Sequence, residues 1–146
     1  MLIEKVSAGN GGADRGVGGD HRVRLRAQVA DLVRERCEGL PPDDAALLRA
    51  IFIAGQTKVE IARLSGKPIH IVRARVKTLI RRVTSREFVY VLRARRGWTA
   101  TRRSVGEACF LHGLSTKAAA GVLRLSPHQV RRHREAIAAL CAEARG

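Results

Sequence analysis

The sequence predicts an all-α protein with tandem helix-turn-helix units, and three observations lead to this fold class. Apolar residues form 45% of the 146 residues but aromatic residues only 3%, so the core is expected to be aliphatic. The apolar residues recur at spacings of three and four, which is typical of helices. A shift of 58 residues superposes two segments of the chain on each other, which indicates a duplicated unit.

A flexible arm and one amphipathic helix are expected before the two units. Residues 1–20 are predicted to be the arm, because six of the fourteen glycines lie between residues 7 and 20. Residues 21–39 are predicted to form the helix, which Gly39 ends. Its apolar face has four residues at helical spacing: Leu25, Val29, Leu32 and Val33. This face is expected either to pack on the first unit or to join two copies of the chain in a homodimer.

The repeat matches the residues that a small helical fold needs. The paired positions are apolar, or they are the glycine and hydroxyl residues that begin a helix: Phe52 with Phe110, Gly55 with Gly113, Thr57 with Ser115, Ala62 with Ala120, and Val72 with Val130. Chance agreement between two helical segments rich in Arg and Ala is the competing explanation. Because glycine, cap and core positions agree together, we favour duplication.

Each copy is predicted to be a helix, a tight turn, a short helix, a second turn and a longer helix. The first unit covers residues 40–83, the second covers residues 99–146, and residues 84–98 link them. The short helices are expected at 58–64 and 116–123, and the longer ones at 68–82 and 127–142. Thr57, Ser115 and Ser126 are expected N-caps, and Pro127 suits a first helical position.

The linker is ambiguous between a strand and a helix. The β-branched residues between Phe88 and Leu92 favour a strand. A cap at Ser85, apolar residues at helical spacing and a stop at Gly97 favour a helix, which is our prediction.

A short helix, a brief turn and a second helix with a basic N-terminal half describe a helix-turn-helix. The first helix needs a small residue where the second crosses it, and Ala62 and Ala120 meet this need. The second helix needs an apolar residue facing the core, and Val72 and Val130 are expected there. Thr57 and Ser115 leave helix N-terminal amides free to bind a DNA phosphate.

Residues 40–83 resemble region 4 of bacterial sigma factors. The resemblance rests on Leu40-Pro41-Pro42 before an acidic helix start, Glu60-Ile61-Ala62, and Val72-Arg73-Ala74-Arg75. The second unit, at about residues 99–140, resembles the DNA-binding domains of response regulators through Gly113-Leu114-Ser115-Thr116-Lys117 and Leu125-Ser126-Pro127. Both resemblances imply DNA binding and regulation of transcription in a bacterium, and the first implies RNA polymerase as a further partner. Residues 1–39 resemble no part of a sigma factor.

The net charge of +15 belongs entirely to the part of the chain that contains the repeat. Residues 1–56 carry eight basic and eight acidic residues, whereas residues 57–146 carry twenty basic and five acidic ones. Such an excess predicts a polyanionic partner, and double-stranded DNA fits best because aromatic stacking residues are scarce. The longest apolar runs are far shorter than the ~20 residues of a membrane span. No secretory signal is visible, so we expect a cytoplasmic, nucleoid-associated protein.

The candidate contacts with DNA lie on the expected longer helices and at the helix starts. The base-reading candidates are His128, Gln129, Arg131 and Arg132 in the second unit, and His70, Arg73, Ala74 and Lys77 in the first. The phosphate-binding candidates are Thr57, Lys58, Ser115, Thr116, Lys117, Arg81, Arg82, Arg102 and Arg103. Solvated basic faces with no dedicated role are the alternative interpretation.

Neither catalysis nor a metal or other cofactor is expected. Cys109, His112, His133 and Cys141 do not follow a paired-ligand spacing. No nucleophile with a base, no carboxylate pair and no phosphate loop stands in a suitable setting.

Two other functions stay open. The first is a protein similar to sigma region 4 that binds RNA polymerase as a coactivator or appropriator, because Ile69 and Ile71 stand where polar groups are usual. The second is a DNA-recognition subunit of a phage or transposon.

Overall fold

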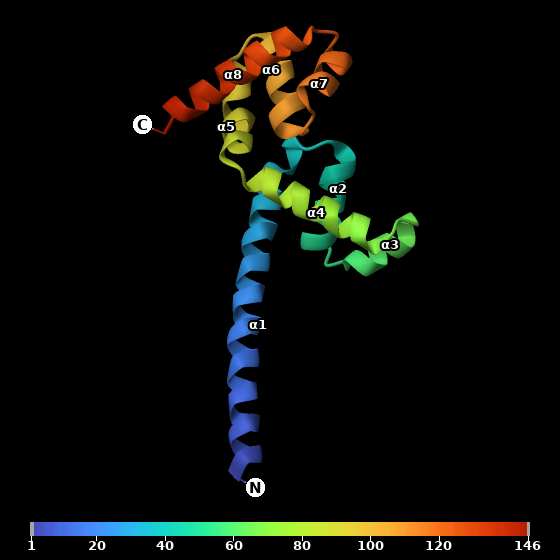
Figure 1. The fold of residues 1–146 in the computed structure, drawn as a ribbon, viewed down its shortest axis with the longest axis vertical. Coiled ribbons are helices and arrows are strands. Elements are labelled where there is room, and N and C mark those ends of the chain that lie inside the picture. Colours follow the sequence, from blue (N-terminus) through green and yellow to red (C-terminus); the bar gives the residue numbers. More distant parts are fainter. Residues whose placement is uncertain (1, 146) are drawn as a thin grey trace.

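The computed structural model describes residues 2–145, with side chains from residue 19 onward, and it is all-α (Figure 1). Within residues 2–145 the backbone forms helices and short helical turns and no strand. The elements are α1 (Leu2–Arg36), η1 (Cys37–Gly39), α2 (Pro42–Phe52), α3 (Lys58–Ser65), α4 (Ile69–Thr84), α5 (Arg86–Ala94), η2 (Arg95–Gly97), α6 (Ala100–Gly106), η3 (Glu107–Leu111), α7 (Thr116–Leu123) and α8 (Pro127–Glu143).

The N-terminal helix is longer than the sequence predicted. We expected a flexible arm over residues 1–20, but α1 begins at Leu2 and projects from the rest of the molecule (Figure 1). Each residue added to an existing helix gains one backbone hydrogen bond, which offsets part of the free-energy cost that glycine has in a helix. In the part of α1 whose side chains are described, only the last turns contain buried residues. Val33 is fully covered, whereas Leu25 is 47% exposed and so does not join the predicted packing face.

The helices after α2 match the predicted repeat closely. The short helices α3 and α7 begin at residues 58 and 116, and the longer helices α4 and α8 begin at residues 69 and 127. Each pair is therefore separated by the same 58 residues. The hydroxyls of Thr57 and Ser115 accept the backbone N–H of Glu60 and Ala118, as predicted for N-caps.

The turns of the two units also repeat in backbone conformation. Gly55 and Gly113 have φ of 76° and 71°, and Gly66 and Arg124 have φ of 69° and 57°. The left-handed conformation is easy for glycine and costly for other residues, so Arg124 keeps a turn that glycine suits better. A backbone conformation retained after its glycine is lost is what duplication would leave.

The linker folds as a helix, as predicted. Ser85 caps α5 by accepting the backbone N–H of Phe88, and Gly97 ends the η2 turn after it. Phe88 and Val91 are fully buried. Gly39 lies against this helix, because a Cβ there would stand 3.0 Å from both Phe88 Cζ and Leu92 Cδ1. Gly39 thus ends the helical turn after α1, as the sequence had suggested, and it also allows this close packing.

One large core joins most of the chain. It contains Val33 of α1, Leu48 of α2, Val76 of α4 and Phe88 of α5, and it extends to Leu111 and Ile137 from the second unit. The second unit has a smaller core of its own, made of Val105, Ala108, Cys109, Ala119, Ala120 and Val130. The two units thus share buried surface, with α5 packed between them.

The first helix of the second unit differs from a regular α-helix in its last turn. The second unit was predicted to begin with a helix, and this helix, α6, passes at Glu107 into the wider π-helical turn η3. The N–H of His112 donates to the carbonyl of Glu107, five residues earlier, at 2.8 Å. Among the helices of residues 2–145, none is both long and apolar enough to cross a membrane.

Candidate nucleic-acid interface

Helix α4 presents a continuous basic stripe to solvent. Its buried face consists of Val72, Val76, Leu79 and Val83, and this face holds the helix on the core. The four predicted base-reading residues of the first unit, and Arg81 one turn further on, lie exposed on the other side: His70, Arg73, Ala74, Lys77 and Arg81. Because these positions recur every three or four residues, their side chains share one face. The helix has five basic residues and no acidic one.

Helix α8 presents a shorter basic surface near its start. Val130 is fully buried, as predicted, and His128, Arg131 and Arg132 are exposed around it. Gln129 is exposed but engaged, because its Oε1 accepts the N–H of Ser126 at 2.9 Å in a capping box. An adenine contact by Gln129 would therefore compete with the cap. Glu135 comes later on the same helix and reduces its charge.

A small cationic hollow lies between α6 and α8. Its volume is about 230 Å³, and it is lined by Arg102, Gln129, Arg132, His133 and Ala136. Arg102 Nε is buried there with no hydrogen-bond partner among the described residues. A buried donor left unpaired costs free energy, and an anionic oxygen would satisfy it. The structure thus brings a phosphate candidate, Arg102, next to a base-reading candidate, Arg132.

Two of the predicted phosphate contacts are used inside the molecule. Arg103 donates to the carbonyls of Arg95 and Trp98 at 3.2 and 3.1 Å, which fixes the η2 turn. The guanidinium of Arg82 lies against Gly113, where a Cβ would overlap it. These two side chains are engaged with protein atoms, so Arg81 is the freer cation at the end of α4.

The remaining phosphate candidates lie around the starts of α3 and α7. Thr57 and Ser115 serve as caps, and Lys117 is exposed beside Ser115. Lys58 is half-buried at the start of α3, at the position that Thr116 occupies in the second unit. Thr116 accepts a hydrogen bond of 2.9 Å from Arg134 of α8, which ties the two helices of the turn together.

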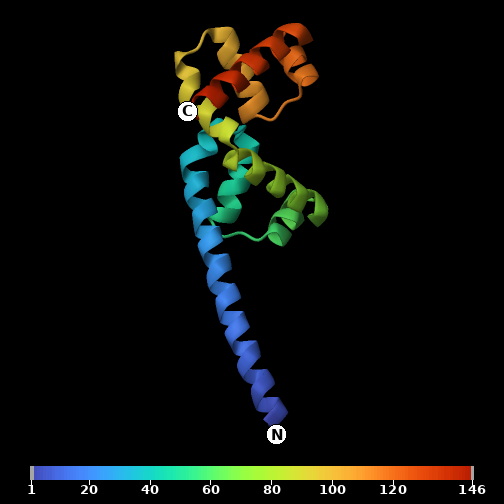
Figure 2. The same ribbon diagram turned by 60° about the vertical axis from the view of Figure 1, so that its left-hand side comes forward.

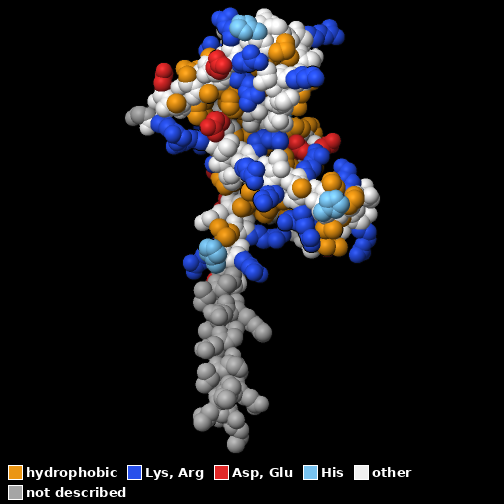
Figure 3. Space-filling view, viewed as in Figure 1, with side chains coloured by type: hydrophobic (Ala, Val, Ile, Leu, Met, Phe, Trp, Pro, Cys, Tyr) orange, Lys and Arg blue, Asp and Glu red, His pale blue; other side chains and the backbone are white. Residues whose placement is uncertain are grey.

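Both turns lie on the same side of the molecule. The α3–α4 and α7–α8 turns lie together at the right in Figures 1 and 2, and the C-terminal ends of α4 and α8 lie on the opposite side. The space-filling view shows blue basic side chains over both units and few red acidic ones (Figure 3). A single polyanion can therefore approach the two helix starts from one direction.

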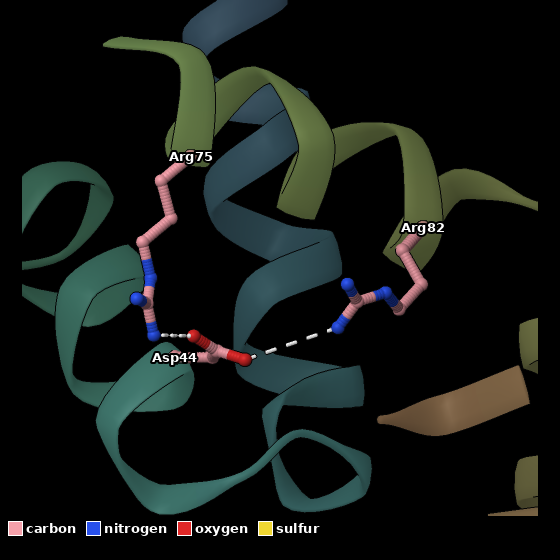
Figure 4. A network of polar contacts seen from close by, with 3 residues as sticks. All are labelled: Asp44, Arg75 and Arg82. Carbon is pink, nitrogen blue, oxygen red and sulfur yellow. Dashed lines mark hydrogen bonds and ion pairs between the residues drawn. The ribbon is translucent and has the colours of Figure 1, made fainter. Parts of the chain in front are cut away.

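Two arginines of α4 pair with one buried carboxylate, which the sequence did not predict. Asp44 of α2 is buried and accepts a hydrogen bond from Nη2 of Arg75, while Arg82 Nη1 lies 3.8 Å from its Oδ2 (Figure 4). The sequence had indicated only an acidic start to this helix, which suits a helix N-terminus. Its spacing of four from Leu48 and seven from Ile51 was the available signal that it faces inward.

Three titratable groups have shifted pKa values: His112, Cys37 and Cys109. Burial lowers the pKa of His112, the nearby Glu107 carboxylate opposes that shift, and the Arg82 guanidinium adds to it. Burial also raises the pKa of the Cys37 and Cys109 thiols, and nearby Arg49 and Arg134 partly oppose this. Among the residues described, no three His, Cys, Asp or Glu side chains are grouped as metal ligands would be.

Comparisons with protein-family models, with curated proteins and with solved structures found no match to this chain. Its function has therefore to be inferred from the geometry of its own residues.

Proposed function

We propose that this protein binds double-stranded DNA sequence-specifically through two helix-turn-helix units and regulates transcription. The observation that carries the proposal is that the repeat presents two basic helix starts, α4 and α8, on one side of the molecule. Two such helices suit successive major grooves, about 10 base pairs apart. In this proposal Arg73, Lys77 and Arg131 read base edges, and Lys117 and Arg102 bind phosphates.

The charge distribution supports DNA over other polyanions. Bidentate arginine contacts to guanine are the commonest specific contacts in the major groove, and both helices carry exposed arginines. The caps at Thr57 and Ser115 place backbone amides at the starts of α3 and α7, where a phosphate is favoured.

The first test is duplex binding as a function of salt, with a randomised pool to select preferred sequences. We expect the logarithm of the association constant to fall with the logarithm of salt concentration by about 0.9 per phosphate contacted. We also expect the pool to yield one motif. Binding that ignores salt, or a pool that enriches nothing, contradicts the proposal.

The second test separates base readers from phosphate binders. Arg131→Ala and Arg73→Ala are each expected to relax preference at one base pair by about 1–3 kcal/mol. Lys117→Ala is expected to weaken all sequences alike and to reduce the salt slope by about one. Arg63→Ala, an exposed cation of α3 outside both stripes, is the control. Equal effects of all four changes would mean that only total charge matters.

A second candidate function is docking on RNA polymerase, as a coactivator or appropriator. The observation that favours it is a hollow of about 230 Å³ between α2, α3 and α4, lined in part by Leu47, Ile61 and Ile71. Ile71 is 47% exposed at its edge. Co-purification with polymerase after nuclease treatment, lost in Ile71→Ser, supports this candidate. Co-purification that nuclease abolishes counts against it.

A further inference from the structure

A large hollow that is open to solvent lies away from the proposed DNA-binding side. Its volume is about 640 Å³, within the usual range for small-ligand sites. The end of α1, the turn between α4 and α5, helix α5 and the last turns of α8 form its walls. We call it the arginine pocket, and we define it by Arg36, Arg86, Tyr90, Arg93, Cys141 and Arg145.

The arginine pocket is strongly cationic. Four arginines line it and no Asp or Glu does. The ion pairs found between described side chains belong to other arginines, namely Arg34, Arg75, Arg82 and Arg95. Arg36 is held in place, because its Nη1 donates to the carbonyl of Val83 at 2.6 Å. Arg86, Arg93 and Arg145 are exposed, and with no carboxylate among the lining residues the local potential is positive, which favours an anion.

The remaining wall is apolar and includes an aromatic ring. Tyr90 lies on the same helix as Arg86 and Arg93, four residues after one and three before the other, so the three side chains share a face. Its ring packs on Trp98 with 6.0 Å between centroids, which limits its motion. Buried Cys141 and the nearby Val89 and Ala94 complete the apolar surface.

We propose that the arginine pocket binds a nucleotide, with the phosphates on the guanidinium groups and the base against Tyr90. Guanidinium groups bind phosphate oxygens through paired hydrogen bonds, and aromatic rings stack on bases. An inorganic anion would use the arginines alone and leave the apolar wall bare. This proposal does not rest on DNA binding, because the pocket lies at the opposite ends of α4 and α8 from their starts.

The test is calorimetric titration of the full chain with ATP, adenosine and tripolyphosphate. We expect ATP to bind at one site, tripolyphosphate to bind about tenfold more weakly, and adenosine to give no heat. Arg93→Ser is expected to weaken ATP about tenfold, whereas Arg63→Ser, with the same change of charge on α3, leaves it unchanged. Tyr90→Leu is expected to bring ATP down to the affinity of tripolyphosphate.

Four results would overturn the proposal. ATP that fails to bind shows that the pocket is not a nucleotide site. Equal affinity for ATP and tripolyphosphate shows a general anion site, and equal losses in Arg93→Ser and Arg63→Ser show attraction by total charge. If a short DNA duplex displaces ATP, and if Arg93→Ser weakens binding of that duplex, the pocket binds the backbone of nucleic acid instead of a nucleotide. Because ATP binding is measured without DNA, its failure is separate from failure of the proposed function.

Discussion

The two three-helix units have the same order of elements but differ in their hydrophobic cores and in the charge of their longer helices. The first unit lies on a large core that α1 and α5 share, whereas the second has a small core rich in alanine. On the surface, α4 has five basic residues and no acidic one, and α8 has three basic and two acidic residues. By contrast α8 begins with a capping box and a proline, while α4 has no side-chain cap.

The two units thus have the same turn conformations, whereas their burial and their charge differ. Gly55 and Gly113, before the short helices, share a left-handed backbone conformation, and so do Gly66 and Arg124, between the short and the long helices. The size of the hydrophobic core differs between the units because the first unit packs against α1 and α5. The first unit provides the more basic helix, and the second has the helix start with a side-chain cap.

The largest expected effect concerns the shared core. Phe88→Ala is expected to lower the free energy of unfolding by about 3–5 kcal/mol, because Phe88 is fully buried where α5 joins the units. Val105→Ala, in the smaller core, is expected to cost about 2 kcal/mol. Urea denaturation followed by circular dichroism measures both. Two separate transitions in the wild-type protein would show that the cores are independent.

The buried carboxylate of the first unit gives the next effect. Asp44→Asn is expected to cost about 3 kcal/mol, because it leaves Arg82 partly buried without its partner charge. The neighbouring exposed Asp43→Asn is the control and is expected to change stability by less than about 0.5 kcal/mol. If the two variants unfold at the same urea concentration, the ion pair does not support the first unit.

Substitutions at the two equivalent turn positions, Gly66 and Arg124, are expected to have smaller effects on stability, with opposite signs. Gly66→Ala is expected to destabilise the first unit by about 1 kcal/mol, because its φ is 69°. Arg124→Gly is expected to stabilise the second by about 0.5 kcal/mol, since relief of strain exceeds the entropy cost of glycine. Thermal melting measures both. Effects of the same sign would contradict the equivalence of the turns.

The smallest expected effect is the pH dependence of stability that His112 contributes. The pKa of His112 lies below its ordinary value of 6.5 in the folded protein, so the unfolded chain binds more protons there. The stability contributed by this group is therefore fully present above pH 6.5 and falls as pH drops from there through the folded pKa. We measure the urea concentration at the midpoint of unfolding as a function of pH. In His112→Gln this curve is expected to be flatter below pH 6.5. A profile that keeps its slope in the variant assigns the dependence to another group.

Much of the local structure was predictable because its causes are local. The caps at Thr57, Ser115 and Ser126 and the starts of α7 and α8 depend on side chains within three residues of the helix start. Helix α5 was predicted from the cap at Ser85 despite its β-branched residues. The candidate DNA contacts on α4 and α8 are exposed because the inward positions of Val72 and Val130 were correctly predicted.

The remaining features depend on contacts between segments distant in sequence. The internal use of Arg82 and Arg103 could not be predicted, because a guanidinium has the same sequence signature whether it faces solvent or a carbonyl. The four arginines of the arginine pocket come from positions 36 to 145 and meet only after folding.

The sequence by itself determined an all-α fold, the 58-residue repeat and the placement of net charge after residue 56, because periodicity, caps and charge are properties of neighbouring residues. Only the tertiary structure decided the extent of α1, the burial of Asp44 and the sharing of one core by both units. These features depend on which surfaces of the folded chain come into contact. The free energy gained by burying a residue depends on the surface it contacts as well as on its residue type.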